Sequence, residues 1–315
     1  LPLFTNEERS LIGTLYMKKG STEAMIHGLE IIGPKMATYA RVGYEIAPER
    51  KALMYCWRGG MRSNSLAWLL NAVGIETHTL QGGYKTFRRY VREYFNEPLN
   101  LVVIGGMTGT GKTKILEVLA SKGKQIIHLE KLAGHRGSVF GGIGQSPQPS
   151  TEQFENDLYA RMAQLNPAEP VFIEDESLSI GNVFIPGNFY NQMIAAPLME
   201  IYMPAERRIQ LLMEEYGSAK TEDLIAAVRK IERRLGLQNA AEIAGYIEQG
   251  QIEQAVERIL VYYDKKYTRS MNQHVRNGYG KITVSGESFE DIADAIVDWS
   301  VNRNKSNTPK TNGRI

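Results

Sequence analysis

The feature that most constrains this sequence of 315 residues is the octapeptide GMTGTGKT, Gly106 to Thr113. It fits the pattern G-x-x-x-x-G-K-[ST], it follows the apolar run LVVIG, and residues with helical spacing follow it. In such a loop, backbone N–H groups approach phosphate oxygens, a lysine supplies a point charge for a β- or γ-phosphate, and a hydroxyl can ligate Mg²⁺. The sequence therefore predicts an α/β domain that binds a phosphorylated ligand. The residues expected to touch phosphate here are Gly106, Gly109, Gly111, Lys112 and Thr113.

The remaining elements of this domain follow from the hydrophobic pattern. Apolar runs at Gln125 to Glu130, Pro170 to Glu176 and Met199 to Met203 predict strands, with helices between them. From Ala205 onward almost all of the sequence has helical spacing, apart from one late strand candidate in GKITVSG.

Three carboxylates end the strand candidate PVFIEDES. Acidic side chains at a strand end beside a phosphate loop can hold a metal ion or orient an attacking group. We expect Asp175 to be catalytic and to bind Mg²⁺ together with Thr113. The sequence leaves the general base open among Glu174, Asp175 and Glu176.

A second feature is the only cysteine of the chain, in MYCWRGGMRS. A short apolar run from Lys51 precedes Cys56, and residues with helical spacing begin after Gly59 and Gly60. This arrangement aims backbone N–H groups and a helix N-terminus at one point, which favours an anion and lowers the pKa of a thiol. A buried structural cysteine is the alternative, but packing explains the glycines and the nearby arginines poorly.

The spacing Cys56-x5-Arg62 occurs in two kinds of loop. One is the cysteine phosphatase loop, which binds a tetrahedral phosphate, and the other is the long form of the rhodanese loop, whose cysteine carries sulfur or selenium. Tyr55 stands where a phosphatase usually has histidine, which disfavours the phosphatase without excluding it.

The composition of the chain indicates where the protein is located but says little about the reaction it catalyses. Lys and Arg number 37 and Asp and Glu 35, so a nucleic-acid surface would have to be a local patch. A lone cysteine forms no internal disulfide, and no apolar run reaches the roughly 18 residues of a membrane span. We therefore expect a cytoplasmic protein that does not use a membrane.

Several long stretches together resemble the bacterial tRNA 2-selenouridine synthases. They are NEERSLIGTLYMKKGSTEAMIHGLEIIGPKM, YCWRGGMRSNSLAWLLNAVGIETHTLQGGYKTFRRYV, HRGS at His135 to Ser138, EDESLSIGNVFIP and YYDKKY. That family opens with a further strand and an acidic-Arg motif before the position of Leu1, so we expect the first strand of the rhodanese-like domain to be missing here. With the hydrophobic pattern, the resemblance predicts a rhodanese-like α/β domain in residues 1–97, a P-loop domain in 98–204 and a mostly helical region in 205–300, and the polar composition of 301–315 predicts a disordered tail.

The resemblance also implies a transferase with two substrates besides RNA. In the family, 2-thiouridine at the tRNA wobble position is first S-geranylated by geranyl diphosphate, and selenium from selenophosphate then replaces the geranylthio group. We expect Lys112 and Thr113 to hold the diphosphate with Mg²⁺, and Arg136 to touch a phosphate, while His135 is either a ligand contact or loop support. The selenophosphate loop would comprise Cys56, Trp57, Arg58, Gly59, Gly60, Met61 and Arg62, with Cys56 and Arg62 catalytic.

The tRNA anticodon region needs a basic surface, and the segment YKTFRRYVREYF offers one. It interleaves aromatic residues with Lys85, Arg88, Arg89 and Arg92, so that cations could meet phosphates and rings could stack on unpaired bases. A linker helix with inward aromatic side chains and solvated arginines is an equally good interpretation.

Three other functions remain open at this stage. One is a P-loop phosphotransferase or NTPase regulated by a rhodanese domain, and another is a cysteine phosphatase joined to an NTPase. The third is a non-enzymatic RNA-binding adaptor, which the intact Cys56, Arg62, Lys112 and Thr113 disfavour.

Overall fold

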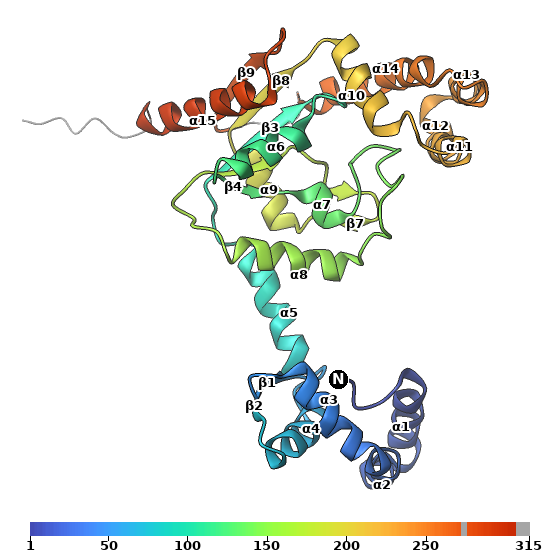
Figure 1. The fold of residues 1–315 in the computed structure, drawn as a ribbon, viewed down its shortest axis with the longest axis vertical. Coiled ribbons are helices and arrows are strands. Elements are labelled where there is room, and N and C mark those ends of the chain that lie inside the picture. Colours follow the sequence, from blue (N-terminus) through green and yellow to red (C-terminus); the bar gives the residue numbers. More distant parts are fainter. Residues whose placement is uncertain (272–275, 307–315) are drawn as a thin grey trace, which may run out of the picture. The chain divides into compact units, whose positions relative to one another are not determined.

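The computed structural model describes residues 1–271 and 276–306. The chain divides into two units, Leu1–Val91 and Arg92–Ile315, and each is described by itself (Figure 1). No helix among the described residues is long and apolar enough to cross a membrane.

The first unit is a small mixed α/β structure. Its elements are α1 (Asn6–Lys19), α2 (Ser21–Ile32), the 3₁₀ turn η1 (Gly33–Lys35), α3 (Met36–Ile46), β1 (Lys51–Met54), α4 (Met61–Ala72) and β2 (Glu76–Thr79), followed by α5 (Gly83–Tyr94), which continues into the second unit. Strands β1 and β2 pair in parallel and are connected by α4, as the strand, loop and helix pattern predicts. A short apolar core of Tyr39, Leu66, Leu70 and Ile75 joins the helices to this sheet.

The second unit is built around a parallel sheet. Its first part contains β3 (Leu101–Gly106), α6 (Lys112–Ser121), β4 (Gln125–Ile127), α7 (Leu129–Ala133), α8 (Thr151–Met162), β5 (Val171–Glu174), β6 (Ser179–Ile180), β7 (Val183–Phe184), α9 (Gly187–Ala195) and β8 (Leu198–Tyr202). Its second part contains α10 (Ala205–Tyr216), α11 (Thr221–Lys230), α12 (Glu232–Leu235), α13 (Leu237–Glu248), α14 (Ile252–Met271), β9 (Tyr279–Thr283) and α15 (Phe289–Ser306).

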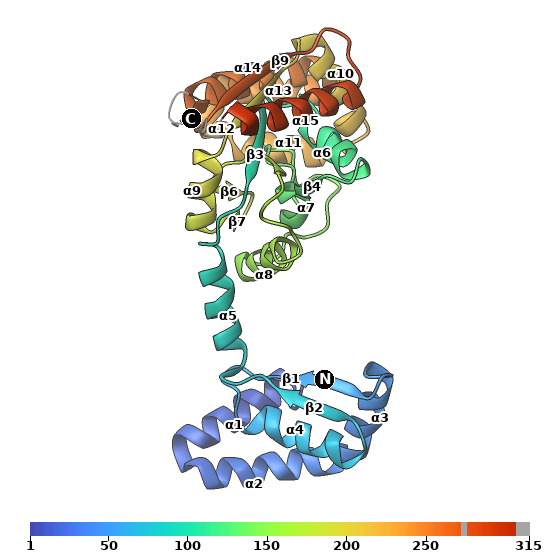
Figure 2. The same ribbon diagram turned by 90° about the vertical axis from the view of Figure 1, so that its left-hand side faces the viewer.

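The order of strands places β3 at the centre of the sheet. The order is β4-β5-β3-β8-β9, with all neighbours parallel, and every residue of β3 is buried. Helices α6 and α15 lie together beside β3 (Figure 2), and their apolar side chains pack with Val102 and Ile104. Helix α9 contacts β3 and α8 contacts β4. A strand covered on both faces must be apolar throughout, which is why LVVIG reads as a continuous apolar run.

Helices α10 to α14 form a second apolar core beside the sheet (Figure 1). Ile209 and Leu212 of α10 pack there with Leu224 of α11, Ile243 of α13 and Ile259 of α14. The prediction of helices after Ala205 with one late strand is therefore confirmed, and the strand is β9.

Two sequence expectations need correction. The predicted strand Gln125 to Glu130 ends at Ile127, because the His128 side chain accepts a hydrogen bond from the Lys131 N–H and caps α7. Helix α15 extends to Ser306, into the segment expected to be a disordered tail. The rest of that tail, 307–315, lies outside the described residues.

Candidate functional site

The phosphate loop connects the end of β3 to the beginning of α6. The Lys112 ammonium lies over this loop and donates a hydrogen bond to the Gly106 carbonyl at 3.2 Å. Gly111 precedes the helix with φ +73°, and a Cβ atom there would lie 2.5 Å from the Phe289 ring, so only glycine fits. The N-terminus of α6 and Lys112 together direct positive potential into one concave surface.

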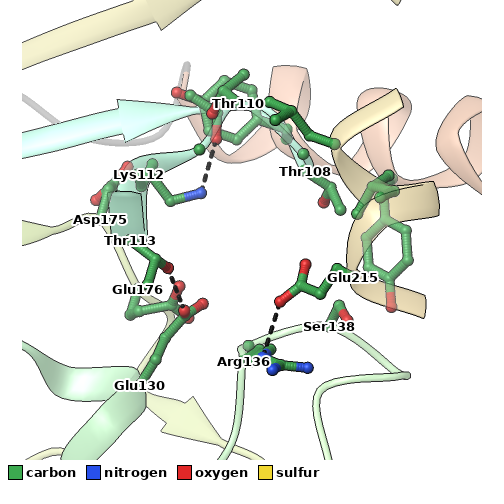
Figure 3. Close-up of a pocket in the computed structure, with 18 of the residues that line it drawn as sticks. Thr108, Thr110, Lys112, Thr113, Glu130, Arg136, Ser138, Asp175, Glu176 and Glu215 are labelled. Carbon is green, nitrogen blue, oxygen red and sulfur yellow. Dashed lines mark hydrogen bonds and ion pairs between the residues drawn. The ribbon is translucent and has the colours of Figure 1, made fainter. Parts of the chain in front are cut away.

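Two carboxyl groups face Thr113 at the bottom of this site. The Thr113 hydroxyl donates to Glu130 Oε2 at 3.0 Å, and the carboxyl group of Glu176 lies beside that of Glu130 (Figure 3). Burial raises the pKa of Glu176 well above its usual range, and the charge of Glu130 raises it further. Burial also raises the pKa of Glu130, although Lys112 acts in the opposite direction. A cation bound beside Glu130 and Glu176 would lower the pKa of both carboxyl groups and favour their ionised forms.

The other two carboxylates of the EDE sequence have different partners. Glu174, which is 1% exposed, accepts a hydrogen bond from the Glu130 N–H at 2.8 Å and lies 3.0 Å from His128 Nδ1. Asp175 forms an ion pair with Arg276 at 2.7 Å. Glu176 is therefore a better candidate metal ligand than Asp175, which is already paired with Arg276.

The phosphate loop opens into a cavity of about 580 Å³. On the side opposite Thr113, Arg136 pairs with Glu215 at 2.8 Å, and Ser138 and Thr108 lie nearby (Figure 3). The aromatic and basic lining of the cavity includes Tyr190, Tyr216, Tyr263, Lys266, Tyr267 and Arg276. Burial raises the pKa of Tyr216 and Tyr263 to about 12, so both phenols stay neutral.

The donor set at Thr113 suits Mg²⁺ better than a metal that needs an all-protein cage. No group of three or more His, Cys, Asp or Glu side chains able to hold a metal occurs in the described part of the chain. Mg²⁺ usually takes one or two carboxylates and leaves its other positions to water and substrate phosphates. Thr113, Glu130 and Glu176 fit that pattern.

His135 supports the loop that carries Arg136. Its ring packs against Gly141 and Gly142, and it is not among the residues that line the cavity. Burial lowers the pKa of His135, so the ring is neutral near pH 7. Loop support is therefore the better interpretation of this histidine.

The thiol loop lies in the first unit, between β1 and α4. Two groups donate hydrogen bonds to Cys56 Sγ: the Gly60 N–H at 3.2 Å and the Ser63 hydroxyl at 3.5 Å. Burial alone would raise the pKa of Cys56, but hydrogen bonds from the Ser63 side chain and from the N–H groups of Gly60, Ser63 and Arg58 lower it to about 7. The thiol is thus poised to form a thiolate at neutral pH.

Close backbone packing fixes this loop. Gly59 has φ +59°, and a Cβ atom there would lie 2.6 Å from the Gly83 nitrogen. The N–H groups of Tyr84 and Lys85 donate to the carbonyls of Cys56 and Trp57, each at 2.9 Å. The start of α5 therefore holds the loop in place.

The side chains around the thiol are open to solvent. Arg58, Met61 and Arg62 are exposed, and Trp57 is 50% exposed while its ring lies 5.7 Å from that of Tyr84. The two cations are therefore accessible to an anionic substrate.

Helix α5 carries the basic residues expected to meet RNA. Lys85, Arg89 and Arg92 are exposed, whereas Arg88 is only 6% exposed. Arg92 also lies 3.9 Å from Glu155. A role for this helix in RNA binding therefore depends on Lys85, Arg89 and Arg92.

The sequence interpretation missed Glu130, Tyr263, Tyr267 and Arg276, all of which line the cavity. Glu130 is the last residue of a predicted strand and was given no role, although an acidic side chain at the end of a strand in the same sheet was a usable signal. Tyr263 and Tyr267 lie in YYDKKY, one of the stretches that carry the family resemblance, but no local pattern connects them or Arg276 to the phosphate loop.

A parallel sheet, a glycine loop at the end of its central strand and a lysine at the start of the next helix define a P-loop phosphate-binding domain. Residues 99–302 match the family model described as the tRNA 2-selenouridine synthase AAA domain. The chain belongs to the tRNA 2-selenouridine synthase family.

Relatives named tRNA 2-selenouridine synthase extend over both units. The protein of Hydrogenovibrio crunogenus is 32% identical, with 95% of this chain and 90% of the relative aligned. That of Proteus mirabilis is 31% identical over 93% of this chain and 87% of the relative. The match to the Nitrosomonas europaea protein, at 35% identity, covers 69% of this chain and 58% of the relative's length.

Similarity to solved structures is weaker. The N-terminal domain of a protein titled as ATP/GTP binding, from Clostridium difficile 630, is 37% identical over 29% of this chain and 71% of its own, with a TM-score of 0.28. The tRNA isopentenylpyrophosphate transferase of Bacillus halodurans is 12% identical over 66% of this chain and 98% of its own, with a TM-score of 0.32.

Proposed function

We propose that this chain, a member of a family that acts on tRNA, converts 2-thiouridine to 2-selenouridine in two transferase steps at two sites. The phosphate loop would bind geranyl diphosphate for S-geranylation, and the thiol loop would handle selenium from selenophosphate. The observation that best supports the first site is the combination of Lys112 with two half-buried carboxyl groups that face Thr113, at the edge of a cavity large enough for a diphosphate ester.

In the first step, the sulfur of 2-thiouridine attacks C1 of the geranyl group. A C–S bond forms, the C–O bond to diphosphate breaks, and the diphosphate leaves with the electron pair, while the base loses its N3 proton to solvent and stays neutral. Lys112 and the N–H groups of the loop would hold the leaving group where its charge develops. Thr113, Glu130 and Glu176 are the residues that would hold Mg²⁺, which when bound neutralises part of that charge.

In the second step, the selenium of selenophosphate attacks C2 of the base: a C–Se bond forms, the C–S bond breaks, and geranylthiolate leaves with the electron pair and takes up a proton. Water then cleaves the P–Se bond, and phosphate leaves. Cys56, whose pKa of about 7 makes both thiol and thiolate available at neutral pH, would supply the proton to the leaving thiolate. Arg58 and Arg62 would attract the selenophosphate anion. The glycine loop supplies N–H groups toward the same point.

We further propose that exposed cations of α5, namely Lys85, Arg89 and Arg92, contact phosphates of the tRNA anticodon region, in the cytoplasm. Replacing Lys85 and Arg89 together by glutamine should weaken tRNA binding and reduce the slope of log affinity against log salt by about 2, because each lost phosphate contact reduces it by about 1. An unchanged slope would remove α5 from the RNA surface.

The decisive experiment follows both steps on one RNA. The chain is incubated with Mg²⁺, 2-thiouridine tRNA and geranyl diphosphate, selenophosphate is then added, and the nucleosides are identified by mass spectrometry. Lys112→Ala should reduce geranylation at least 100-fold, whereas Lys124→Ala, on the exposed turn after α6, serves as the matched control. Cys56→Ser should leave geranylation intact and stop selenium incorporation.

The opposite outcomes are equally informative. If Cys56→Ser stops geranylation and Lys112→Ala does not, the assignment of the two sites is wrong. If the wild type hydrolyses ATP without a prenyl donor and leaves the tRNA unmodified, the chain is a nucleotide-driven phosphotransferase instead.

A further inference from the structure

A second, smaller cavity adjoins the phosphate-loop cavity. Its volume is about 30 Å³, and it lies within the apolar core formed by α10, α11, α13 and α14. The five residues that line both cavities are Thr108, Ser138, Leu212, Tyr216 and Tyr263. Thr108 belongs to the phosphate loop itself, and together with Ser138 it lies on the side of the larger cavity opposite Thr113 (Figure 3). The phosphate site and the apolar core are therefore neighbours.

One face of α14 forms a continuous wall through both cavities. Tyr263, Lys266 and Tyr267 line the larger cavity, and Ile252, Ala255, Val256, Ile259, Leu260 and Tyr263 line the smaller one. The spacing of three and four residues keeps all of them on one side of the helix. The twelve residues from Ile252 to Tyr263 span about 16 Å, because each of the eleven steps along a helix rises about 1.5 Å.

The smaller cavity accepts only apolar groups beyond its neck. Ala255, Ile259 and Leu260 are 1%, 4% and 3% exposed, and apart from the five shared residues the whole lining is aliphatic or aromatic. A base or sugar placed there would lose its hydrogen bonds to water without replacement, which is costly. A cavity of this character is dry and takes hydrocarbon.

We propose that the smaller cavity receives the end of the hydrocarbon chain of a prenyl diphosphate whose diphosphate lies on the phosphate loop. The five shared residues form the neck between the two ends of the donor. This inference rests on the function proposed above and adds the residues that select the length of the chain. Because the cavity is small, Tyr216 and the flexible Met213, which packs against this core, must shift as the chain enters.

Equilibrium binding of a series of ligands tests the proposal on the wild-type chain. With Mg²⁺ present, inorganic diphosphate, dimethylallyl diphosphate and geranyl diphosphate share the charged group and differ in apolar length. Each buried methylene adds up to about fourfold in affinity, so geranyl diphosphate should bind at least tenfold more tightly than dimethylallyl diphosphate. Equal affinities of the two prenyl ligands would overturn the proposal.

A filled cavity tests the location. Ala255→Leu places extra volume in the smaller cavity, and should weaken geranyl diphosphate at least tenfold while inorganic diphosphate changes less than twofold. Ala240→Leu makes the same change in the same helical core at a buried position that does not line the cavity, and should affect neither ligand. Equal losses for both ligands in Ala255→Leu, or the same selective loss in Ala240→Leu, would refute the assignment.

A cross-linking experiment does not depend on how well the variant folds. A geranyl diphosphate analogue with a photoreactive diazirine at the end of its chain is irradiated with the wild-type chain, and the adducts are mapped by peptide mass spectrometry. Adducts on residues 252–263, on α11 or α13, or on Phe140 support the proposal, because these line the smaller cavity, and adducts confined to other segments overturn it.

Failure of the inference and failure of the proposed function look different. If the wild type geranylates tRNA while Ala255→Leu keeps full affinity for geranyl diphosphate, only the chain subsite is wrong. If the wild type binds inorganic diphosphate and no prenyl diphosphate, both are wrong.

Discussion

Replacing Ser63 by alanine should make the Cys56 thiol harder to ionise. The Ser63 hydroxyl donates to the sulfur at 3.5 Å, and it makes the largest single contribution to lowering the pKa of Cys56. The N–H groups of Gly60, Ser63 and Arg58 remain in the variant, so the pKa should rise from about 7 only part of the way toward the ordinary value of 9.0.

The magnitude follows from the titration curve. A pKa of about 7 leaves about half of the thiol ionised at pH 7, and a rise of about one unit leaves about a tenth, so alkylation by iodoacetamide should slow about fivefold. The direction of the pKa shift also sets how the stability of the fold depends on pH. Because the folded pKa is depressed, the thiolate and the stability it contributes are lost as pH falls through about 7 in the wild type, and already at higher pH in Ser63→Ala.

The assay is the rate of Cys56 alkylation between pH 5 and 10, followed by intact mass. The chain has one cysteine, so every adduct reports on this site. Ser65→Ala, an exposed position on the same helix, is the control and should leave the profile unchanged. A Ser63→Ala profile that coincides with the wild type, or a wild-type midpoint near 9, would refute the reasoning.

Two further predictions concern stability. Asp264→Asn should destabilise the second unit by about 3 kcal/mol in urea unfolding, because it leaves the buried Arg208 guanidinium without its carboxylate. Glu242→Gln, which breaks an exposed ion pair, should change the midpoint very little, and equal effects of the two changes would contradict the argument. Phe172→Ala removes a ring that is 1% exposed in the sheet core and should cost about 3 to 5 kcal/mol. Phe184→Ala, at a ring that is 55% exposed, should be nearly neutral, and a reversed order would show that burial does not decide the loss.

Features that depend on neighbouring residues could be predicted from the sequence. A loop that binds phosphate needs glycines and a lysine at fixed spacing, so the loop from Gly106 to Thr113 can be identified from the sequence alone. The same holds for the thiol loop around Cys56 and for the buried strand β3, whose residues must all be apolar because helices cover both faces. The limits of local reasoning appear at His128, whose cap ends a predicted strand early.

The roles of the three carboxylates depend on long-range contacts. Successive residues of an extended segment point to opposite sides, so Glu174 and Glu176 meet Glu130 while Asp175 meets Arg276, 101 residues further along the chain. No sequence pattern near Asp175 predicts its pairing with Arg276. The sequence therefore assigned the metal to Asp175 and left the general base open among Glu174, Asp175 and Glu176, because no local pattern separates the three carboxylates.

The sequence by itself determined where the phosphate-loop motif and the thiol loop lie, because both depend on short spacings that the backbone translates directly into geometry. Only the tertiary structure decided which carboxyl groups face Thr113, that Arg88 is buried, and that an apolar cavity adjoins the phosphate loop. That cavity is formed by side chains from four helices whose apolar stripes look alike in sequence. Which of those side chains meet, and where they leave space, is settled by packing over long distances along the chain.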